Sequence, residues 1–282
     1  MPCEWCDDTG WKPVERGGVR TVARCDCWRD RVGRQRLTDA NIPQRYRHCT
    51  IDSFAAYNES LERAADHARR VAEQFPAVPK GLFLEGQPGV GKTHLAVAVL
   101  RQVVQASGAR GLFYDTRDLL RVIRATYDPS IRTTEIEVLR PVMTAELLVL
   151  DDLGAEKTSE WVEETLNLIV TIRYNEKRLT LFTSNYPDIP DDTDPNALLF
   201  RIGFRMRSRL HEMCDFVQLD GADYRELPAN GGVDDLIALW KVRRKTPLAS
   251  PRGGRQARAQ LRDGQTRDGR ADLKWPGGRA GS

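Results

Sequence analysis

The chain has 282 residues, of which 40% are hydrophobic and 29% charged, so it can form one α/β domain with appendages. No apolar run approaches the roughly 18–20 residues that span a bilayer, and the start of the chain lacks the apolar core of a signal peptide. We therefore expect a cytoplasmic protein without a membrane partner. The net charge of +3 is unevenly spread, because residues 241–282 hold 12 Lys and Arg against 3 Asp and Glu. Such asymmetry indicates a polyanionic partner, or equally a solvated disordered tail.

Four of the six cysteines lie near the start of the chain, with the spacing C-x₂-C-x₁₈-C-x-C. Two close pairs separated by such a loop are typical of a tetrahedral Zn²⁺ site, and a metal would supply folding energy that so small a segment lacks. Free thiols and redox chemistry are the alternatives, and disulfides are disfavoured in a cytosolic protein. Cys49 and Cys214 stand alone, so we expect them to be packing residues. The predicted Zn²⁺ ligands are Cys3, Cys6, Cys25 and Cys27.

Residues 28–47 are rich in arginine and form either a basic helix and linker that contacts nucleic acid or a solvated connector. Residues 59–75 have the apolar spacing of a helix, which Pro76 and Pro79 end.

The segment that organises the chain fits G-x-x-x-x-G-K-[ST], the phosphate-binding P-loop. It lies between a predicted buried strand at 81–85 and a helix at 94–104, which is the order that the motif requires. The alternative is a glycine-rich turn that matches by chance. Backbone N–H groups and the helix dipole would bind phosphates, Lys92 would reach the β- and γ-phosphates, and Thr93 would bind Mg²⁺. The predicted nucleotide contacts are Gly86, Gln87, Pro88, Gly89, Val90, Gly91, Lys92, Thr93 and His94.

A second short strand is expected at 111–114, followed by a helix at 118–127 that presents two arginines and a tyrosine to solvent. Basic and aromatic groups together suit non-specific binding of single strands, although an ordinary solvated helix face has the same composition. These candidate DNA contacts are Arg121, Arg124 and Tyr127.

The apolar run from residue 147 ends in Asp151 and Asp152, about 60 residues after the P-loop, and fits a central parallel strand with a Walker B motif. Asp151 would hold Mg²⁺ through water, and Asp152 would activate the attacking water. A helix follows from Thr158 or Ser159 to residue 177. The next strand, at 179–185, ends in Asn185, which is expected to face the γ-phosphate or to end the strand as a turn residue.

A basic helix is expected at 201–213, a last strand at 215–219 and a short helix at 234–242. Beyond residue 245 the hydrophobic periodicity disappears, and we expect disorder.

Several of these motifs together resemble the DnaC/DnaI-type replicative helicase loaders, and the related IstB transposition ATPases, within the AAA+ superfamily. The resemblance runs from about residue 42 to residue 225. Its motifs are GQPGVGKTH (86–94), LLVLDDLGAEKTSEWVEETLNLIVTIRYNEKR (147–178), TSNY (183–186), SRL (208–210) and DYR (223–225).

The resemblance implies a role for each matched position. Asn185 is similar to sensor 1, Arg209 to the arginine finger that completes a neighbouring subunit's site, and Arg225 to sensor 2. Arg205 and Arg207 lie on the same predicted helix and are rival fingers. The implied catalytic set is Lys92, Asp151, Asp152, Asn185, Arg209 and Arg225.

The expected fold is a P-loop AAA+ α/β fold, with a central parallel five-stranded sheet flanked by helices. We expect a zinc-binding partner-interaction module at 1–36, the ATPase domain at 42–242 and a basic disordered tail at 243–282. The leading hypothesis is an oligomeric, ATP- and Mg²⁺-dependent ATPase that loads a DnaB-type replicative ring helicase onto single-stranded DNA. The alternatives are an IstB-like regulator of a transposase on duplex DNA and a nucleotide-gated adaptor with little turnover.

Overall fold

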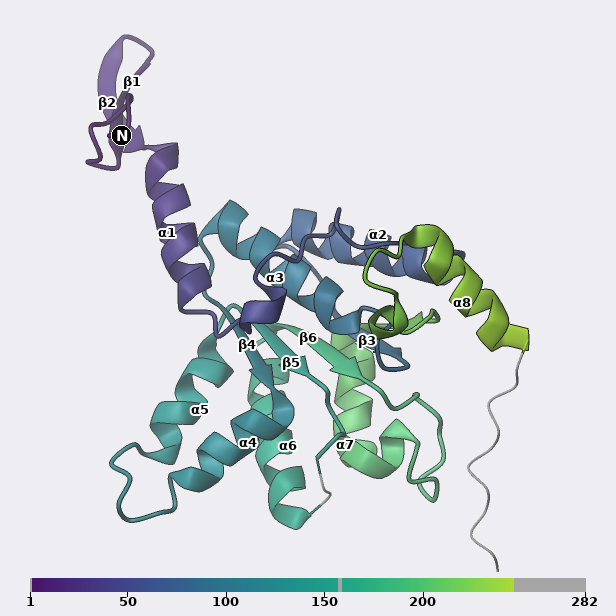
Figure 1. Ribbon diagram of the computed structural model, residues 1–282. Helices are drawn as coiled ribbons and strands as arrows, with labels where there is room; N and C mark the ends of the chain where they lie inside the picture. The colour runs from purple at the N-terminus through teal and green to yellow at the C-terminus, as the bar shows by residue number, and fades with distance from the viewer. Residues whose placement is uncertain (1, 157–158, 246–282) are drawn as a thin grey trace, which may run out of the picture. The chain divides into compact units, whose positions relative to one another are not determined.

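Five parallel strands form the central sheet of the computed structural model, which describes residues 2–156 and 159–245 (Figure 1). The strand order is β4-β5-β6-β3-β7, and every neighbouring pair is parallel. This confirms the predicted α/β fold with its five-stranded parallel sheet. The strands are β3 (Gly81–Gly86), β4 (Gly111–Asp115), β5 (Leu147–Asp151), β6 (Leu179–Ser184) and β7 (Cys214–Leu219).

Helices cover both faces of the sheet, and the strand side chains alternate between the two resulting cores. In β5, Leu147 and Val149 pack in one core, whereas Leu148 and Leu150 pack in the other. Because both faces are buried, the central strand is a continuous apolar run. The helices α2 (Glu59–Gln74) and α3 (Lys92–Ser107) cover one face, and α4 (Thr116–Ala125), α5 (Glu135–Thr144), α6 (Glu160–Asn175) and α7 (Leu198–Met213) cover the other.

Arg173 of α6 is buried in the second core, with 1% of its surface exposed. Its guanidinium donates to the carbonyls of Val142 and Ala145 at the end of α5, both at 2.9 Å, and to Leu179 O at 2.6 Å. Its Nε also donates to Thr180 Oγ1 at 2.9 Å. Burial lowers the pKa of Arg173 to about 9. The side chain therefore ties α5, α6 and β6 together by satisfying carbonyls that the helix end leaves unpaired.

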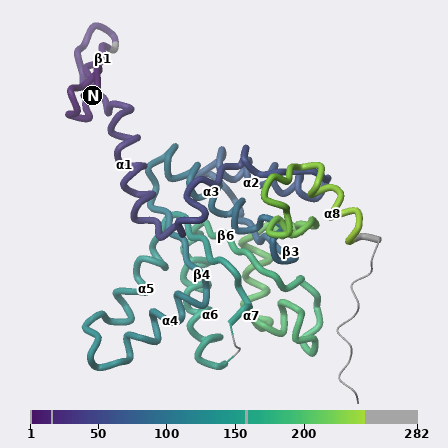
Figure 2. The backbone as a smooth tube through the Cα atoms, in the orientation of Figure 1, coloured from purple at the N-terminus to yellow at the C-terminus, as the bar shows by residue number. Residues whose placement is uncertain are grey.

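The chain begins with an antiparallel hairpin of β1 (Trp11–Arg16) and β2 (Val19–Arg24). Its two-residue turn, Gly17–Gly18, has positive φ at both positions, which is the geometry of a type I′ turn. Helix α1 (Asp26–Thr38) follows and packs against α3 (Figure 2). At Gly33 of α1 an added Cβ would lie 3.3 Å from Gln105 Cα, so the two helices approach closely. The short 3₁₀ helix Gln44–Tyr46 then leads towards α2.

The C-terminal part of the described chain contains the 3₁₀ helix Tyr224–Glu226 and helix α8 (Val233–Lys245). Helix α8 is longer than predicted, so residues 243–245 are helical rather than part of the expected tail. The remainder of that tail lies outside the described residues. Helix α7 also begins earlier than predicted, because its first turn buries Leu198 and Leu199, and it is kinked at Gly203. None of the helices in the described ranges has the length and apolar content needed to cross a membrane.

Candidate functional site

The predicted nucleotide-binding residues meet at one edge of the sheet. Strands β3, β5, β6 and β7 run parallel, so the segments that follow their carboxyl ends lie together. There they border a cavity of about 650 Å³. The polar residues that line it include Lys92, Thr93, Asp151, Asp152, Asn185 and Arg225. Five of the six implied catalytic residues thus share one cavity.

The P-loop joins β3 to α3 and is packed closely against a later turn. Gly89 has φ +80°, and an added Cβ would lie 1.7 Å from the Asp223 carboxylate. Gly89 O also accepts a hydrogen bond from Tyr224 N at 3.0 Å. The loop therefore needs glycine at this position both for its backbone conformation and for the contact with the turn that carries Arg225.

Lys92 is buried at the start of α3, and its ammonium group donates three hydrogen bonds. Nζ donates to Gly86 O at 2.7 Å, to Gln87 O at 2.8 Å and to Asn185 Oδ1 at 2.8 Å. Burial lowers the pKa of Lys92 to about 8, although the nearby Asp151 and Asp152 oppose that shift. The lysine and the predicted sensor asparagine are therefore in direct contact.

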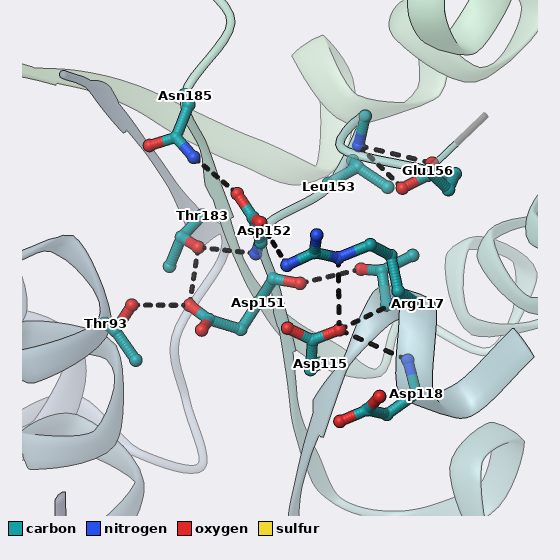
Figure 3. Close-up of polar contacts among 12 residues, drawn as sticks. Thr93, Asp115, Arg117, Asp118, Asp151, Asp152, Leu153, Glu156, Thr183 and Asn185 are labelled. Carbon is teal, nitrogen blue, oxygen red and sulfur yellow. Dashed lines mark hydrogen bonds and ion pairs between the residues drawn. The ribbon is translucent and has the colours of Figure 1, made fainter. Parts of the chain in front are cut away.

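Asp151 ends β5 and accepts two hydroxyl hydrogen bonds on the same carboxylate oxygen (Figure 3). Thr93 Oγ1 lies 2.8 Å from Oδ1 and Thr183 Oγ1 lies 2.6 Å from it. Burial raises the pKa of this carboxyl group. A hydroxyl and a carboxylate beside a phosphate loop are hard oxygen donors of the kind that Mg²⁺ prefers, so Thr93 and Asp151 fit their predicted roles as a metal-binding pair.

Asp152 has a positive φ of 59°, and each of its two carboxylate oxygens accepts a hydrogen bond. Oδ1 accepts from Asn185 Nδ2 at 2.5 Å, and Oδ2 accepts from Arg117 Nη2 at 3.1 Å (Figure 3). Burial raises the pKa of Asp152, and the Arg117 charge opposes that rise. Arg117 belongs to the first turn of α4, whose amide groups are capped by Asp115. Sequence reasoning missed Arg117, because nothing in the sequence places α4 against the end of β5.

His94 lines the same cavity but forms contacts with the chain segment before α2. Its Nε2 lies 2.9 Å from Thr50 O and 3.2 Å from Ser53 Oγ, and its ring packs at a tilt against Phe54. Burial lowers the pKa of His94.

The candidate arginine fingers lie on α7, after the kink at Gly203. Arg207 forms a bidentate pair with Asp188, with Nε and Nη2 at 2.5 and 3.0 Å from the two carboxylate oxygens. Arg205 is exposed, and Arg209 is partly exposed with one long contact, 3.4 Å, to Arg205 O. Among the described residues that line the cavity, none of these three arginines is present.

Of the candidate DNA contacts, Arg121 and Arg124 lie on α4 and Tyr127 lies just after it, and two of the three meet at Trp161 of α6, for which the sequence predicted no DNA contact. The Arg124 guanidinium lies 4.5 Å from the centre of the Trp161 ring, and Trp161 Nε1 donates to Tyr127 Oη at 3.1 Å. Arg121 instead pairs with Asp118 on its own helix at 2.9 Å.

The four N-terminal cysteines converge, with all four sulfur atoms within 4.8 Å of one another. The Sγ atoms of Cys3 and Cys25 are 3.7 Å apart, and those of Cys6 and Cys27 are 3.2 Å apart. Cys3 and Cys6 lie in the loop before β1, whereas Cys25 and Cys27 lie at the start of α1. Four convergent thiols form a donor set that fits a structural Zn²⁺ ion.

Comparisons with known proteins agree with this geometry. Residues 29–227 match the family of IstB-like ATP-binding proteins. The chain is 27% identical over 149 residues to the replicative helicase loader DnaC of Buchnera aphidicola from Acyrthosiphon pisum, a match that spans 53% of this chain and 60% of that relative. It thus spans less than two thirds of this curated relative's length.

Two solved structures have a similar fold. A crystal structure of the DnaC helicase loader superposes with a TM-score of 0.56 at 35% identity and covers 63% of this chain and 99% of that one. AMPPCP-bound DnaA from Aquifex aeolicus superposes with a TM-score of 0.51 at 20% identity, over 61% of this chain and 50% of that one, and shows the shared AAA+ fold alone. Because the family match covers residues 29–227, which include the P-loop and the sheet edge beside it, the chain belongs to the family of IstB-like ATP-binding proteins.

Proposed function

We propose that the chain is an ATPase that loads a replicative ring helicase onto single-stranded DNA. The observation that carries this proposal is the 35% identity to the DnaC helicase loader structure, over nearly the whole length of that structure. The family match and the cavity at the P-loop support the ATP-dependent part of the proposal.

The arrangement of residues at the sheet edge suits hydrolysis of a nucleoside triphosphate. Lys92 and the P-loop amides would bind the phosphates, and Thr93 with Asp151 would hold Mg²⁺, which neutralises charge on the phosphate oxygens. Asp152 would orient the attacking water and accept its proton, while Asn185 holds the carboxylate in place through the 2.5 Å hydrogen bond. Because Lys92 donates to two P-loop carbonyls, phosphate oxygens would compete directly for its protons.

Two further arginines would link the site to assembly. Arg225 lies in the cavity of its own chain and would sense the phosphates there. Arg209 would reach the site of a neighbouring copy and stabilise charge on the γ-phosphate, with Arg205 as its rival. Arg207 is the weakest candidate, because Asp188 already holds its guanidinium. ATP binding would then favour an oligomer, and hydrolysis would release it.

Single-stranded DNA would bind at the surface formed by α4 and Trp161. Arg121 and Arg124 would contact phosphates, and the Tyr127 and Trp161 rings would stack on bases. The cysteine cluster would hold Zn²⁺ and organise the N-terminal hairpin as a module for binding a partner protein.

The test is a pull-down of the replicative helicase by the full chain with ATP, combined with hydrolysis assays with and without single-stranded DNA. We expect capture of a hexameric helicase, DNA-stimulated hydrolysis and loss of hydrolysis in Lys92→Ala. Lys80→Ala, a change outside the cavity, is the matched control. Intact hydrolysis in Lys92→Ala would falsify the assignment of the P-loop.

A second candidate function is regulation of a transposase on duplex DNA, which the IstB-like family match favours. The same pull-down separates the two candidates. Preferential binding of duplex DNA, without capture of the helicase, would support the transposition factor and contradict the loader. Negligible turnover with intact nucleotide binding would instead indicate an adaptor.

A further inference from the structure

The cavity at the P-loop is lined by two kinds of residue that come from different parts of the fold. Most of the polar residues follow the carboxyl ends of the sheet strands, and Arg45 and Ser53 come from the segment before α2. Apart from Pro88 and Val90 of the P-loop, the apolar and aromatic lining comes mainly from the segment before α2, the start of α2, the turn after β7 and α8, and it includes Tyr46, Phe54, Tyr57, Leu61, Ala222 and Leu236. A nucleoside triphosphate has the same division, because its phosphates are highly charged and its base is a flat apolar ring.

Helix α8 reaches this apolar lining through one of its faces. Leu236, Trp240 and Arg243 are spaced four and three residues apart, so they lie on the same side of the helix. Leu236 is 2% exposed and lines the cavity itself. Trp240 contacts Tyr57, which also lines the cavity, and Arg243 contacts Gly221, which precedes the lining residue Ala222.

Trp240 and Arg243 contact the segment before α2 and the turn after β7. The Trp240 ring packs edge-on against Tyr57 with the ring centres 6.2 Å apart, and its Nε1 donates to Asp220 Oδ2 at 3.2 Å. Arg243 Nη1 donates to Gly221 O at 3.2 Å. Tyr57 Oη in turn accepts from Ala222 N at 2.6 Å. The helix therefore fixes both Tyr57 and the turn after β7, which carries Arg225 a few residues later.

Helix α8 lies beyond the part of the chain that matches the family, since the match ends at residue 227 and the helix begins at Val233. We propose that α8 forms the base-side wall of the nucleotide site, with Leu236 packed into that wall and Trp240 positioning Tyr57 beside the nucleoside. The inference rests on the proposed function in one respect, namely that the cavity binds a nucleoside triphosphate. It adds a binding element to the site that the family match does not include.

The test compares two ligands with the full-length chain and its variants. ATP has both a base and phosphates, whereas inorganic tripolyphosphate has only the phosphates. Leu236→Ala should weaken ATP binding about 10-fold, because the shortened side chain leaves a gap in the base-side wall of the cavity. Its affinity for tripolyphosphate should stay within about twofold of the unaltered chain. Leu239→Ala makes the same change on the same helix at a position that does not line the cavity, and it should leave both affinities unchanged.

Leu236→Trp is a second variant that keeps an apolar side chain but fills the base-side space. It should exclude ATP and still bind tripolyphosphate. Titration calorimetry measures both ligands, and thermal unfolding verifies that each variant is folded. Equal ATP affinity in Leu236→Ala and the unaltered chain would overturn the role of α8, as would a parallel loss of both ligands in the two Leu236 variants. Failure of the unaltered chain to bind either ligand would overturn the proposed function as well.

Discussion

The carboxyl edge of the sheet and the N-terminal cysteine hairpin both bring polar side chains together, but the surrounding structure differs. At the sheet edge, the strands that position Asp151 and Asn185 are buried on both faces by helices. In the hairpin region, the buried residues among positions 2–15 and 17–28, whose burial the structure describes, are Cys6, Gly10 and Cys25. Val19 and Val22 of β2 are 62% and 69% exposed. The first site is held by a hydrophobic core, whereas the second has almost none, and a bound metal would stabilise it instead.

Replacement of one of the four proposed zinc ligands should have the largest effect, and it should affect the hairpin but not the sheet. Cys25→Ser should remove bound zinc and unfold the hairpin, because zinc contributes about 10–16 kcal/mol to the folding of comparable zinc-finger peptides. Helices α2 and α3 and the sheet should stay folded. Metal analysis by mass spectrometry and amide hydrogen exchange measure the two effects. Cys214→Ser is the control, because Cys214 lies in the core of the sheet domain, and this variant should bind as much zinc as the unaltered chain. Full metal occupancy in Cys25→Ser, or no zinc in the unaltered chain, would contradict the assignment.

The next largest effect is expected at Arg173, the buried arginine in the core between the sheet and helices α4 to α7. Arg173→Met should lower the free energy of unfolding by about 3 kcal/mol, because buried carbonyls of Val142, Ala145 and Leu179 lose their donors. Arg178→Met, which removes a partly exposed guanidinium nearby, should cost less than about 1 kcal/mol. Urea denaturation measures both values. Equal costs would mean that the buried hydrogen bonds do not contribute more than the exposed ones.

A smaller effect concerns the pH dependence of ATP binding at the sheet edge. The pKa of Lys92 is lowered by burial to about 8, so the ammonium group loses its proton as the pH rises above that value. Since phosphates bind the protonated form, ATP affinity should fall by up to about 10-fold per pH unit above pH 8. Lys92→Arg keeps its charge in this range and should show no such decline. Calorimetric titrations from pH 7 to 9.5 test this, and identical profiles would exclude Lys92 as the titrating group.

The smallest effect is expected at the ion pair that joins Arg117 of α4 to Asp152, the proposed catalytic carboxylate. Arg117→Ala removes the positive charge 3.1 Å from Asp152, so the pKa of that carboxyl group should rise further. The acid side of the hydrolysis rate profile should therefore move to higher pH, with a change at fixed pH of less than about fivefold for so exposed a pair. Arg121→Ala, on the same helix but paired with Asp118, should leave the profile in place. An unshifted profile in Arg117→Ala would show that the pair does not tune Asp152.

The sheet and most of its polar edge could be predicted because each depends on a local pattern. The apolar run 147–150 could only be a buried strand in this context, and parallel strands bring Asp151 and Asn185 to one edge. The spacing of the cysteines likewise predicted their convergence.

The remaining features depend on contacts between distant segments or run against local preference. Arg117 and Trp161 have no sequence signal, since their roles arise from the packing of α4 against β5 and α6. Helix α5 was not predicted, and Pro141 within it is a helix-breaking residue. The β1–β2 hairpin was also missed. Its strands are short and largely exposed, so they lack the alternation of polar and apolar residues that marks a half-buried strand.

The contact between α1 and α3 has a geometric consequence for the whole chain. Helix α3 carries Lys92 in its first turn and touches α1 near Gln105, thirteen residues further on. At 1.5 Å per residue, a straight helix fixes the separation of these two points at about 20 Å. Because Gly33 allows the two helix backbones to touch, a larger residue there would tilt α1 away from α3 without altering any group that lines the cavity. The position of the cysteine hairpin relative to the phosphate loop thus depends on the α1–α3 contact, which Gly33 makes close.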